Sequence, residues 1–340
     1  MRDVAAEAGV SPMTVSNALN GKRPVSEQTR RLVMETVERM GYQVNVAARS
    51  LRQRRTGVVG IAVPILDSHY YARLSHRLVR AFARAGLASV VEETRASREG
   101  ELAAFRDSRL NAYDGLVIAS LGLSEREIDA LSREVPVVVL GEQELHRTVD
   151  RVGMPNAESA AAATRLLVER GCRRLAIVGA PQGPDGATLP EAAAFLPRAD
   201  GFHDVAAAAG LSAASVHEGV TQEAGVRCAR RLLELPERPD GVFCVTDTLA
   251  FGVLRGLADH AVRVPEDVLV VGFDDVEDAR YLVPSLSSVA PDLDVLVGEA
   301  VRLLTRRIAD PAAPAQEVTV PFTVVEREST RRPHDRRPPP

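Results

Sequence analysis

The stretch DVAAEAGVSPMTVSNALN, residues 3–20, decides the fold of the N-terminal part of this chain. It predicts two short helices joined by a tight turn, in which Gly9 supplies the positive φ that the turn needs. Ser11 is a good N-cap for the second helix, and Pro12 follows at the first helical position, where its missing N–H costs nothing. Helical spacing packs one apolar set against another, namely Val4, Ala5 and Ala8 against Val15, Ala18 and Leu19.

A third helix is expected after Ser26, with Leu32, Val33, Val37 and Met40 facing inward. Three short helices at this spacing form the unit that places its second helix in the major groove of DNA. We therefore predict an all-α helix-turn-helix DNA-binding domain over residues 1–43. Because Met1 and Arg2 are the only residues before the DVA element, we expect the first helix to be poorly capped.

The distribution of charge supports a nucleic-acid partner, although the whole chain carries a net charge of −4. Residues 1–56 hold ten Lys and Arg against five acids, which makes this segment +5 and leaves −9 for the remainder. A basic head on an acidic body is the layout of a DNA-binding module attached to a sensor.

Three stretches resemble a known family: DVAAEAGVSPMTVSNALNG, VSEQTRRLVMETVERMGY and NVAARSL. In this order they resemble the LacI/GalR family of bacterial transcription regulators, and the chain to about residue 330 resembles the family's effector-binding core. The resemblance implies a repressor of sugar or related catabolic genes that binds a pseudo-palindromic operator as a homodimer. A small polar effector, with a sugar or glycoside favoured over a purine or another metabolite, is implied to switch it.

Composition places the chain among soluble proteins of the cytoplasm, where a DNA-binding regulator is associated with the nucleoid. With 340 residues and 45% hydrophobic content, it has no apolar run of membrane-spanning length and no signal peptide. The cysteines are widely spaced, so we expect reduced, buried thiols at Cys172, Cys228 and Cys244.

Beyond residue 57, short runs of Val, Ile and Leu alternate with helix-length amphipathic stretches. Continuous apolar strands separated by helices indicate parallel sheets that are covered on both faces. The pattern restarts near residue 156, which predicts an α/β core of two lobes. The family resemblance implies that this core is periplasmic-binding-protein-like, with a ligand cleft between the lobes.

These patterns set the expected boundaries. A hinge helix and linker cover 44–56, and the effector core covers 57–330. Lobe 1 takes about 57–156 and 286–318, and lobe 2 takes about 157–285 and 319–330; residues 318–325 should complete the sheets. The Gly- and Pro-rich stretch 179–190 is expected to be a loop, and the tail 331–340 to be disordered.

No enzyme signature is present. The sequence contains no GxG, no GxxxxGK[ST] and no HExxH, and its histidines and cysteines are not at metal-ligand spacing. We therefore predict a protein that is not an enzyme and that needs no cofactor or metal. A solute-binding protein for transport, which uses the same two-lobe core, is the alternative; the basic head and the absent export signal count against it.

The resemblance assigns the DNA contacts to two places. In the second helix, Pro12, Met13 and Asn17 stand at base-reading positions, and Thr14, Ser16 and Asn20 can serve phosphates. Asn pairs with adenine, whereas Pro12 and Met13 offer only apolar contact, and Pro12 can equally be no more than a helix starter.

The second place is the hinge helix, NVAARSL over residues 45–51. Within it, Asn45 and the small Ala48 belong to the expected minor-groove segment, and Leu51 matches the wedge that kinks the duplex. The other interpretation of Leu51 is an ordinary core leucine. Because so short a helix is marginal alone, we expect it to fold only on DNA.

The effector residues also follow from the resemblance. Arg198 matches a cleft arginine whose planar fork suits hydroxyls or a carboxylate, and Asp274 matches a cleft carboxylate. Tyr70 and Tyr71 match residues that line the cleft, with simple packing as the alternative.

Other positions depart from the family pattern, and they leave the effector open. Thr246, which replaces a usual Asn, and Val220, which replaces a frequent stacking aromatic, are still expected among the effector-binding residues. Gly141 replaces a frequent Asp for which Glu142 can substitute. Asp247 is expected to cap the helix that follows it, and Asp275 to be a cap or a surface acid.

Overall fold

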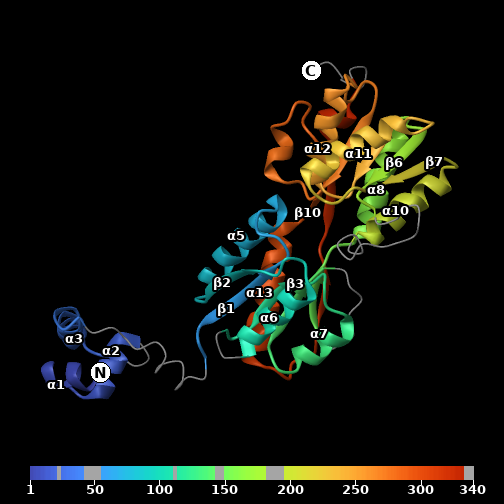
Figure 1. Cartoon of the computed structure of the whole chain (residues 1–340). Helices are drawn as coiled ribbons and strands as arrows, with labels where there is room; N and C mark the ends of the chain where they lie inside the picture. The colour runs from blue at the N-terminus through green and yellow to red at the C-terminus, as the bar shows by residue number, and fades with distance from the viewer. Residues whose placement is uncertain (21–23, 42–54, 110–112, 142–148, 181–194, 333–340) are drawn as a thin grey trace. The chain divides into compact units, whose positions relative to one another are not determined.

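The computed structural model describes residues 1–20, 24–41, 55–109, 113–141, 149–180 and 195–332 (Figure 1). The chain divides into two compact units, Met1–Thr56 and Gly57–Pro340, which we treat separately. No helix in the described ranges is both long enough and apolar enough to span a membrane.

In its described residues, the N-terminal unit contains three helices, α1 (Arg2–Glu7), α2 (Pro12–Asn20) and α3 (Glu27–Arg39). Gly9 has a φ of +63°, and Ser11 Oγ accepts from the backbone N–H of Thr14 at 3.0 Å, so the predicted turn and N-cap are confirmed. Met1 precedes α1 without a side-chain capping bond. The small core contains the predicted residues of the first two helices and one from the third, with Leu19 and Val37 packed at its edge: Val4, Ala5, Ala8, Val15, Ala18 and Val33.

One expectation for α3 is wrong. Leu32 and Met40 are 45% and 42% exposed, and the inward face consists of Val33, Thr36 and Val37. Leu32 is one residue, or about 100°, away from that face, and Met40 is the C-cap, where the helix ends.

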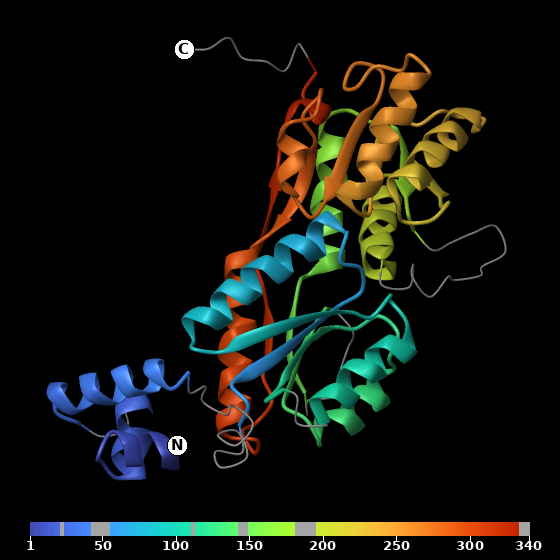
Figure 2. The same cartoon turned by 60° about the vertical axis from the view of Figure 1, so that its left-hand side comes forward.

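The core contains two six-stranded sheets, one in each lobe (Figures 1 and 2). The first sheet has the order β11-β5-β4-β3-β1-β2, and all its strand pairs are parallel. Its strands are β1 (Val58–Val63), β2 (Ala88–Glu93), β3 (Leu116–Ala119), β4 (Val137–Leu140), β5 (Asp150–Gly153) and β11 (Glu317–Thr319).

The second sheet has the order β12-β10-β9-β8-β6-β7 and is parallel except for the β10–β12 pair. Its strands are β6 (Arg174–Val178), β7 (Ser212–Val216), β8 (Gly241–Cys244), β9 (Leu269–Phe273), β10 (Ser287–Pro291) and β12 (Phe322–Val325). As predicted, the late stretch completes both sheets, because β11 joins the first and β12 joins the second.

Helices cover the sheets because the central strands are apolar on both faces. In the first lobe these are α5 (His69–Arg84), α6 (Arg98–Arg109), α7 (Glu125–Ser132) and α13 (Leu293–Ala309). In the second they are α8 (Asn156–Glu169), α10 (Leu196–Ala208), α11 (Gln222–Glu234) and α12 (Asp247–Asp259), with the 3₁₀ turns η1 (Glu277–Arg280) and η2 (Glu328–Thr330). The three cysteines are free and buried in the second lobe.

Within its described part, the chain crosses between the lobes after β5, between β10 and α13, and between β11 and β12. The second crossing therefore follows Pro291, whereas the sequence placed the return to lobe 1 at residue 286. β10 belongs to the second lobe because it pairs with β9 and β12. A buried strand and a following helix carry no local mark of which lobe they join.

Several sequence-based expectations lie wholly or largely outside the described residues: the hinge helix over 45–51, the loop over 179–190 and the tail over 331–340.

Candidate DNA-binding surface and effector cleft

The first turn of α2 presents most of the side chains that the sequence assigned to DNA. Pro12 is exposed, Met13 is 67% exposed, and Ser16 and Asn17 are half-buried. Thr14 is half-buried as well, and its hydroxyl lies 2.9 Å from Ser11 Oγ. An exposed methionine contributes nothing to so small a core, so it is free to contact a partner.

The remaining residues assigned to DNA are not described. They are the side chain of Asn20, which ends α2, and Asn45, Ala48 and Leu51.

In the core, Arg198 lies in the first turn of α10 and is only 6% exposed, so it is not a surface arginine. Its Nε donates to Asn156 Oδ1 at 2.7 Å, and its Nη1 donates to the backbone carbonyl of Val245. Bonds to two different parts of the second lobe thus fix the guanidinium in one orientation. A buried charge needs such partners, since removing it from water is costly.

Two phenylalanine rings complete the surroundings of Arg198. Its Cζ lies 3.5 Å from the ring centroid of Phe273 and 5.3 Å from that of Phe195. A guanidinium over an aromatic face gains a cation–π attraction while its edge stays available for hydrogen bonds.

Asp274 directly follows β9 and is 7% exposed. Its Oδ1 lies 3.8 Å from Arg198 Nη1, which is too long for a hydrogen bond, so the two groups attract without being bonded. Burial raises the pKa of the Asp274 carboxyl to about 7, although the positive charge of Arg198 lowers it. The second lobe therefore holds a buried carboxyl group beside a buried guanidinium cation, without a direct hydrogen bond between them.

Tyr70 and Tyr71 bring the first lobe to the same place. Both are half-buried in the first turn of α5, with ring centroids 5.2 Å apart and an edge-to-face angle of 73°. Burial and then the charge of Asp274 raise the pKa of both hydroxyls, whereas Arg198 lowers it. The tyrosines therefore remain protonated donors near the Arg198–Asp274 pair.

The expectation that Asp247 caps α12 is wrong. Thr246 is the N-cap, and its Oγ1 accepts from the backbone N–H of Leu249 at 3.3 Å. Because a hydroxyl on the residue before the helix already fills the capping position, the Asp247 carboxylate is released for another role. The Thr246 hydroxyl is correspondingly committed to the helix.

Asp247 is fully buried beneath the Asp274 turn. Its Oδ1 accepts from Ser288 Oγ at 2.7 Å, and its Oδ2 accepts from the backbone N–H of Val276 at 2.9 Å. A Cβ at Gly272 would lie 2.1 Å from Asp247 Oδ1, so only glycine fits there. Burial, followed by the charge of Asp274, raises the pKa of Asp247 well above its ordinary value.

Asp275 is neither a cap nor a surface acid. It is half-buried, its Oδ1 lies 2.7 Å from Nη2 of Arg327, and its backbone carbonyl accepts from Arg73 Nη1 of α5 at 2.8 Å. Its own N–H donates to Ser288 Oγ at 3.1 Å. The second lobe therefore reaches α5 through the residue next to Asp274.

The departures from the family pattern have different consequences. Val220 is half-buried between β7 and α11, and its aliphatic side chain gives no ring for stacking. Gly141 has a φ of +129°, a conformation that residues with a Cβ rarely adopt, so glycine is required by the backbone. Glu142, the suggested substitute, lies outside the described residues.

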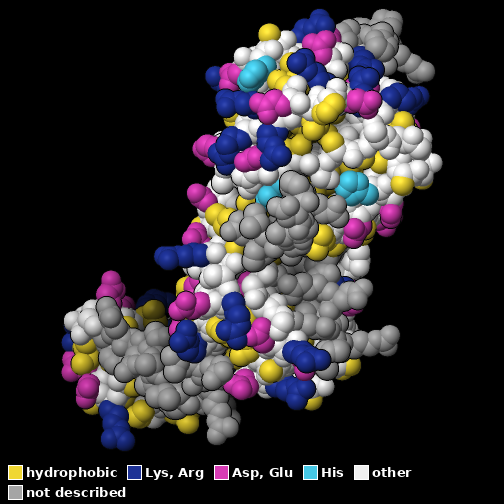
Figure 3. Space-filling model, turned by 45° about the vertical axis from the view of Figure 1, so that its right-hand side comes forward, with side chains coloured by type: hydrophobic (Ala, Val, Ile, Leu, Met, Phe, Trp, Pro, Cys, Tyr) yellow, Lys and Arg dark blue, Asp and Glu magenta, His cyan; other side chains and the backbone are white. Residues whose placement is uncertain are grey.

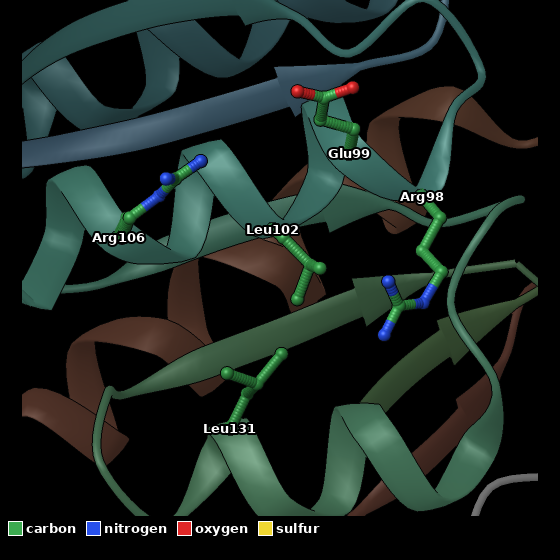
Figure 4. Close-up of a pocket in the computed structure, with 5 residues that line it drawn as sticks. All are labelled: Arg98, Glu99, Leu102, Arg106 and Leu131. Atoms are coloured by element: carbon green, nitrogen blue, oxygen red, sulfur yellow. The ribbon is translucent and has the colours of Figure 1, made fainter.

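A cavity of about 160 Å³ borders this site, lined in part by Arg73, Asp274, Asp275 and Pro291. A larger open hollow of about 530 Å³ lies between α6 and α7 of the first lobe (Figure 4). Leu102 and Leu131 form its apolar part, and none of the predicted residues lines it. Geometry and charge therefore favour the smaller, inter-lobe cavity as the edge of the functional site. Among the described residues, no group of three or more His, Cys, Asp or Glu is placed to hold a metal ion.

Sequence reasoning missed the residues that hold the cleft together. Asn156 orients Arg198 from 42 positions away, and Arg327 reaches Asp275 from the C-terminal segment. No local pattern marks such partners, because only the fold brings them close. Phe273 is the exception, since it stands directly before Asp274 in the motif that indicated the site.

Comparisons with known proteins agree with this division. Residues 1–45 match the family described as bacterial regulatory proteins, lacI family, and residues 164–330 match a periplasmic binding protein-like domain. Catabolite control protein A from Priestia megaterium is 28% identical over 333 residues, which cover 97% of this chain and 98% of that protein.

Two solved structures extend the likeness. A structure from Sanguibacter keddieii DSM 10542, assigned to the LacI family of transcriptional regulators, is 38% identical, with a TM-score of 0.71 over 81% of this chain and 99% of its own. The transcriptional regulator CelR in complex with cellobiose is 28% identical, with a TM-score of 0.69 over 96% of this chain and 98% of its own.

Proposed function

Because this chain belongs to the LacI family of bacterial regulatory proteins, we propose that it binds operator DNA as a homodimer and represses genes of sugar catabolism. It acts in the cytoplasm, at the nucleoid. A small polar effector held between the two lobes switches it. Two features of the chain support this proposal together. Side chains of α2 are exposed, and Arg198 and Asp274 are buried with their facing atoms 3.8 Å apart.

On the DNA side, Asn17 offers an amide that can pair with adenine, and Met13 offers apolar contact to a thymine methyl group. Thr14, Ser16 and Asn20 would bind phosphates, and Asn45, Ala48 and Leu51 the minor groove. On the face of the core shown in Figure 3, basic and acidic side chains are interspersed. The remainder of the chain has a net charge of −9, so the positive field that attracts DNA comes from residues 1–56, whose net charge is +5.

On the effector side, the cleft presents donors and acceptors in one small space. Arg198 and the protonated hydroxyls of Tyr70 and Tyr71 donate, and Asp274 accepts. Adjacent hydroxyls of a sugar can do both, so one ring lying beside the pair can accept from Arg198 and donate to Asp274, whose facing atoms are 3.8 Å apart. Val220 provides no stacking ring, which favours a sugar or glycoside over a purine. The cellobiose complex of the relative CelR supports the same class.

Exposed apolar side chains on the core fit a second copy of the chain. Val79 on α5 and Val90 on the edge strand β2 are 36% and 41% exposed, and Tyr281 and Val283 after η1 are 71% and 98% exposed. We propose that the homodimer covers these side chains. Two-fold symmetry of the protein then requires two-fold symmetry of the operator.

Selection of bound duplexes from a random library tests the DNA-binding part. The full chain should recover inverted half-sites, and its affinity should fall steeply with salt because several phosphates are contacted. A chain that remains monomeric in sedimentation and binds no duplex at low salt would overturn the proposal. The effector is then sought by thermal shift with panels of sugars, glycosides and nucleosides; stabilisation by nucleosides alone would reverse the choice of class.

A further inference from the structure

The turn that carries Asp274 has an unusual backbone. Asp274 has a φ of +109° and Asp275 a φ of +46°, and neither is a glycine. Such conformations persist only where the surrounding structure holds them in place, and they gather at functional sites. The tethers of this turn therefore decide where the Asp274 carboxylate points.

The backbone N–H groups of the turn are all anchored. Asp274 N donates to the Val289 carbonyl at 2.9 Å, Asp275 N donates to Ser288 Oγ, and Val276 N donates to Asp247 Oδ2. These bonds fix the backbone on the side of β10 and α12. Besides these bonds, the turn is held by its Asp275 residue, whose carboxylate makes a further contact.

The Asp275 carboxylate forms an ion pair with Arg327, a half-buried residue that follows β12. Arg327 Nη2 lies 2.7 Å from Asp275 Oδ1, Nη1 donates to the Leu286 carbonyl at 2.7 Å, and its backbone N–H donates to Ser287 Oγ at 2.7 Å. The arginine is thus fixed to the strand segment that runs beside the turn. The ion pair is largely shielded from solvent, since its side chains are only 15% and 17% exposed.

We propose that Arg327 and Asp275 form a positioning pair, which holds the strained turn so that Asp274 stays buried in the cleft and faces Arg198. Arg327 does not touch the effector itself. The pair also presents the Asp275 carbonyl to Arg73 of α5, so the same turn contacts the first lobe. The inference rests on the proposed function only where it takes Asp274 as the effector's acceptor.

The pKa of the Asp274 carboxyl group depends on whether this group is buried, so its titration tests the positioning without an effector. Around its carboxylate lie Tyr70 and Tyr71 from α5, Arg198 from α10 and Asp247 from α12. The burial of Asp274 in this group raises its pKa to about 7. If the turn relaxes and the carboxylate reaches water, the pKa must fall. If Arg327 acted only as a nearby positive charge, its removal would raise the pKa, so the two roles predict opposite signs.

The experiment is ¹³C NMR titration of the full chain labelled at the aspartate carboxyls, with the Asp274 signal assigned from Asp274→Asn. We expect a pKa near 7 in the unmodified chain and a fall of about two pH units in Arg327→Gln. Arg327→Lys keeps the positive charge but loses the planar guanidinium. In this variant the pKa of Asp274 should fall by about one pH unit.

Glu326→Gln is the matched control, because it breaks a half-buried ion pair with Arg170 at the residue next to Arg327. It should leave the Asp274 pKa unchanged. An unchanged or raised pKa in Arg327→Gln, or in Arg327→Lys if the glutamine variant fails to fold, would overturn the inference, as would a pKa near 4 in the unmodified chain. Absence of operator or sugar binding would overturn the proposed function and leave this titration intact.

Discussion

The N-terminal unit and the second lobe expose the side chains that we propose to be functional to opposite degrees. Met13 of α2 is 67% exposed, whereas Arg198 and Asp274 are 6% and 7% exposed. The N-terminal surface therefore depends on its partner to cover it, while the cleft is oriented in advance by bonds to Asn156 and Val245. Substitutions in the cleft must disturb the fold as well as binding, and substitutions on α2 should disturb binding alone.

The two regions also differ in the size of the core behind them. Among the described residues, six buried apolar side chains support the N-terminal helices, whereas an extended apolar cluster on both faces of the sheet supports the second lobe. Local features such as helix caps should therefore matter more to the first region.

The largest expected effect comes from Arg198→Ala. It leaves Asn156 without its donor and Asp274 without its counter-charge, which should cost about 3–5 kcal/mol of core stability. Effector affinity should fall about ten- to a hundredfold. Urea unfolding followed by circular dichroism measures the stability of the core, and calorimetric titration measures the effector affinity. Arg263→Ala is the control, since it breaks an exposed ion pair with Asp267; equal losses of stability in both variants would mean that the cleft arginine is not held as described.

The stability of the core should also depend on pH. Because burial raises the folded-state pKa of Asp274 to about 7, above its unfolded value, this group stabilises the fold at low pH and loses that contribution as the pH rises through 7. Asp274→Asn should abolish this decrease in stability, because an amide does not titrate. The stability difference between variant and unmodified chain should then grow in favour of the variant by about 1.4 kcal/mol per pH unit between roughly pH 4 and 7. Parallel stability curves for the two proteins would show that Asp274 is not buried as an acid.

On the exposed surface, Asn17→Ala should cost about 1–3 kcal/mol of operator binding through the lost base contact. Met13→Ala should cost less than about 1 kcal/mol, since it removes only apolar contact. Neither change should alter the unfolding of the N-terminal unit, because both side chains lie outside its core. Fluorescence anisotropy with a selected operator, alongside a scrambled duplex, separates the two effects; a marked loss of folding in Met13→Ala would place that side chain in the core instead.

A small effect on stability is also expected from the helix caps in the two regions. Ser26 Oγ accepts from Thr29 N–H at the start of α3, and Thr221 Oγ1 accepts from Ala224 N–H at the start of α11. Replacing either by Ala should cost about 1 kcal/mol. In the small N-terminal unit this corresponds to a Tm decrease of roughly 4–8 °C, and in the larger core to about half as much. Calorimetry that gives equal shifts would contradict the difference in core size.

The fold was predictable wherever the signal is local. Continuous runs such as 58–63 became buried strands, and Gly9 and Ser11 took the conformations that the turn and the cap require. Arg198 and Asp274 were indicated by motifs, and the structure brings them together.

What could not be predicted depends on competition between neighbours or on distant partners. Asp247 was expected to cap α12, but the Thr246 hydroxyl occupies that position, so the carboxylate turns inward to Ser288. The strand after residue 286 was assigned to the wrong lobe because its partners, β9 and β12, are set by topology. Pairs such as Asp275 and Arg327, 52 positions apart, leave no trace in spacing.

We propose that α2 reads DNA while a buried pair in the core holds the effector that controls DNA binding. Its most direct test is the anisotropy of a selected operator duplex, titrated with the sugars that stabilise the chain, for the unmodified protein, Arg198→Ala and Asn17→Ala. We predict that a sugar changes the operator affinity of the unmodified chain and that Asn17→Ala binds the duplex weakly. At a temperature where Arg198→Ala stays folded, we predict that it binds the duplex as well as the unmodified chain but responds only at roughly ten- to a hundredfold higher sugar concentration. A sugar that changes operator affinity of Arg198→Ala as strongly as that of the unmodified chain would contradict the account.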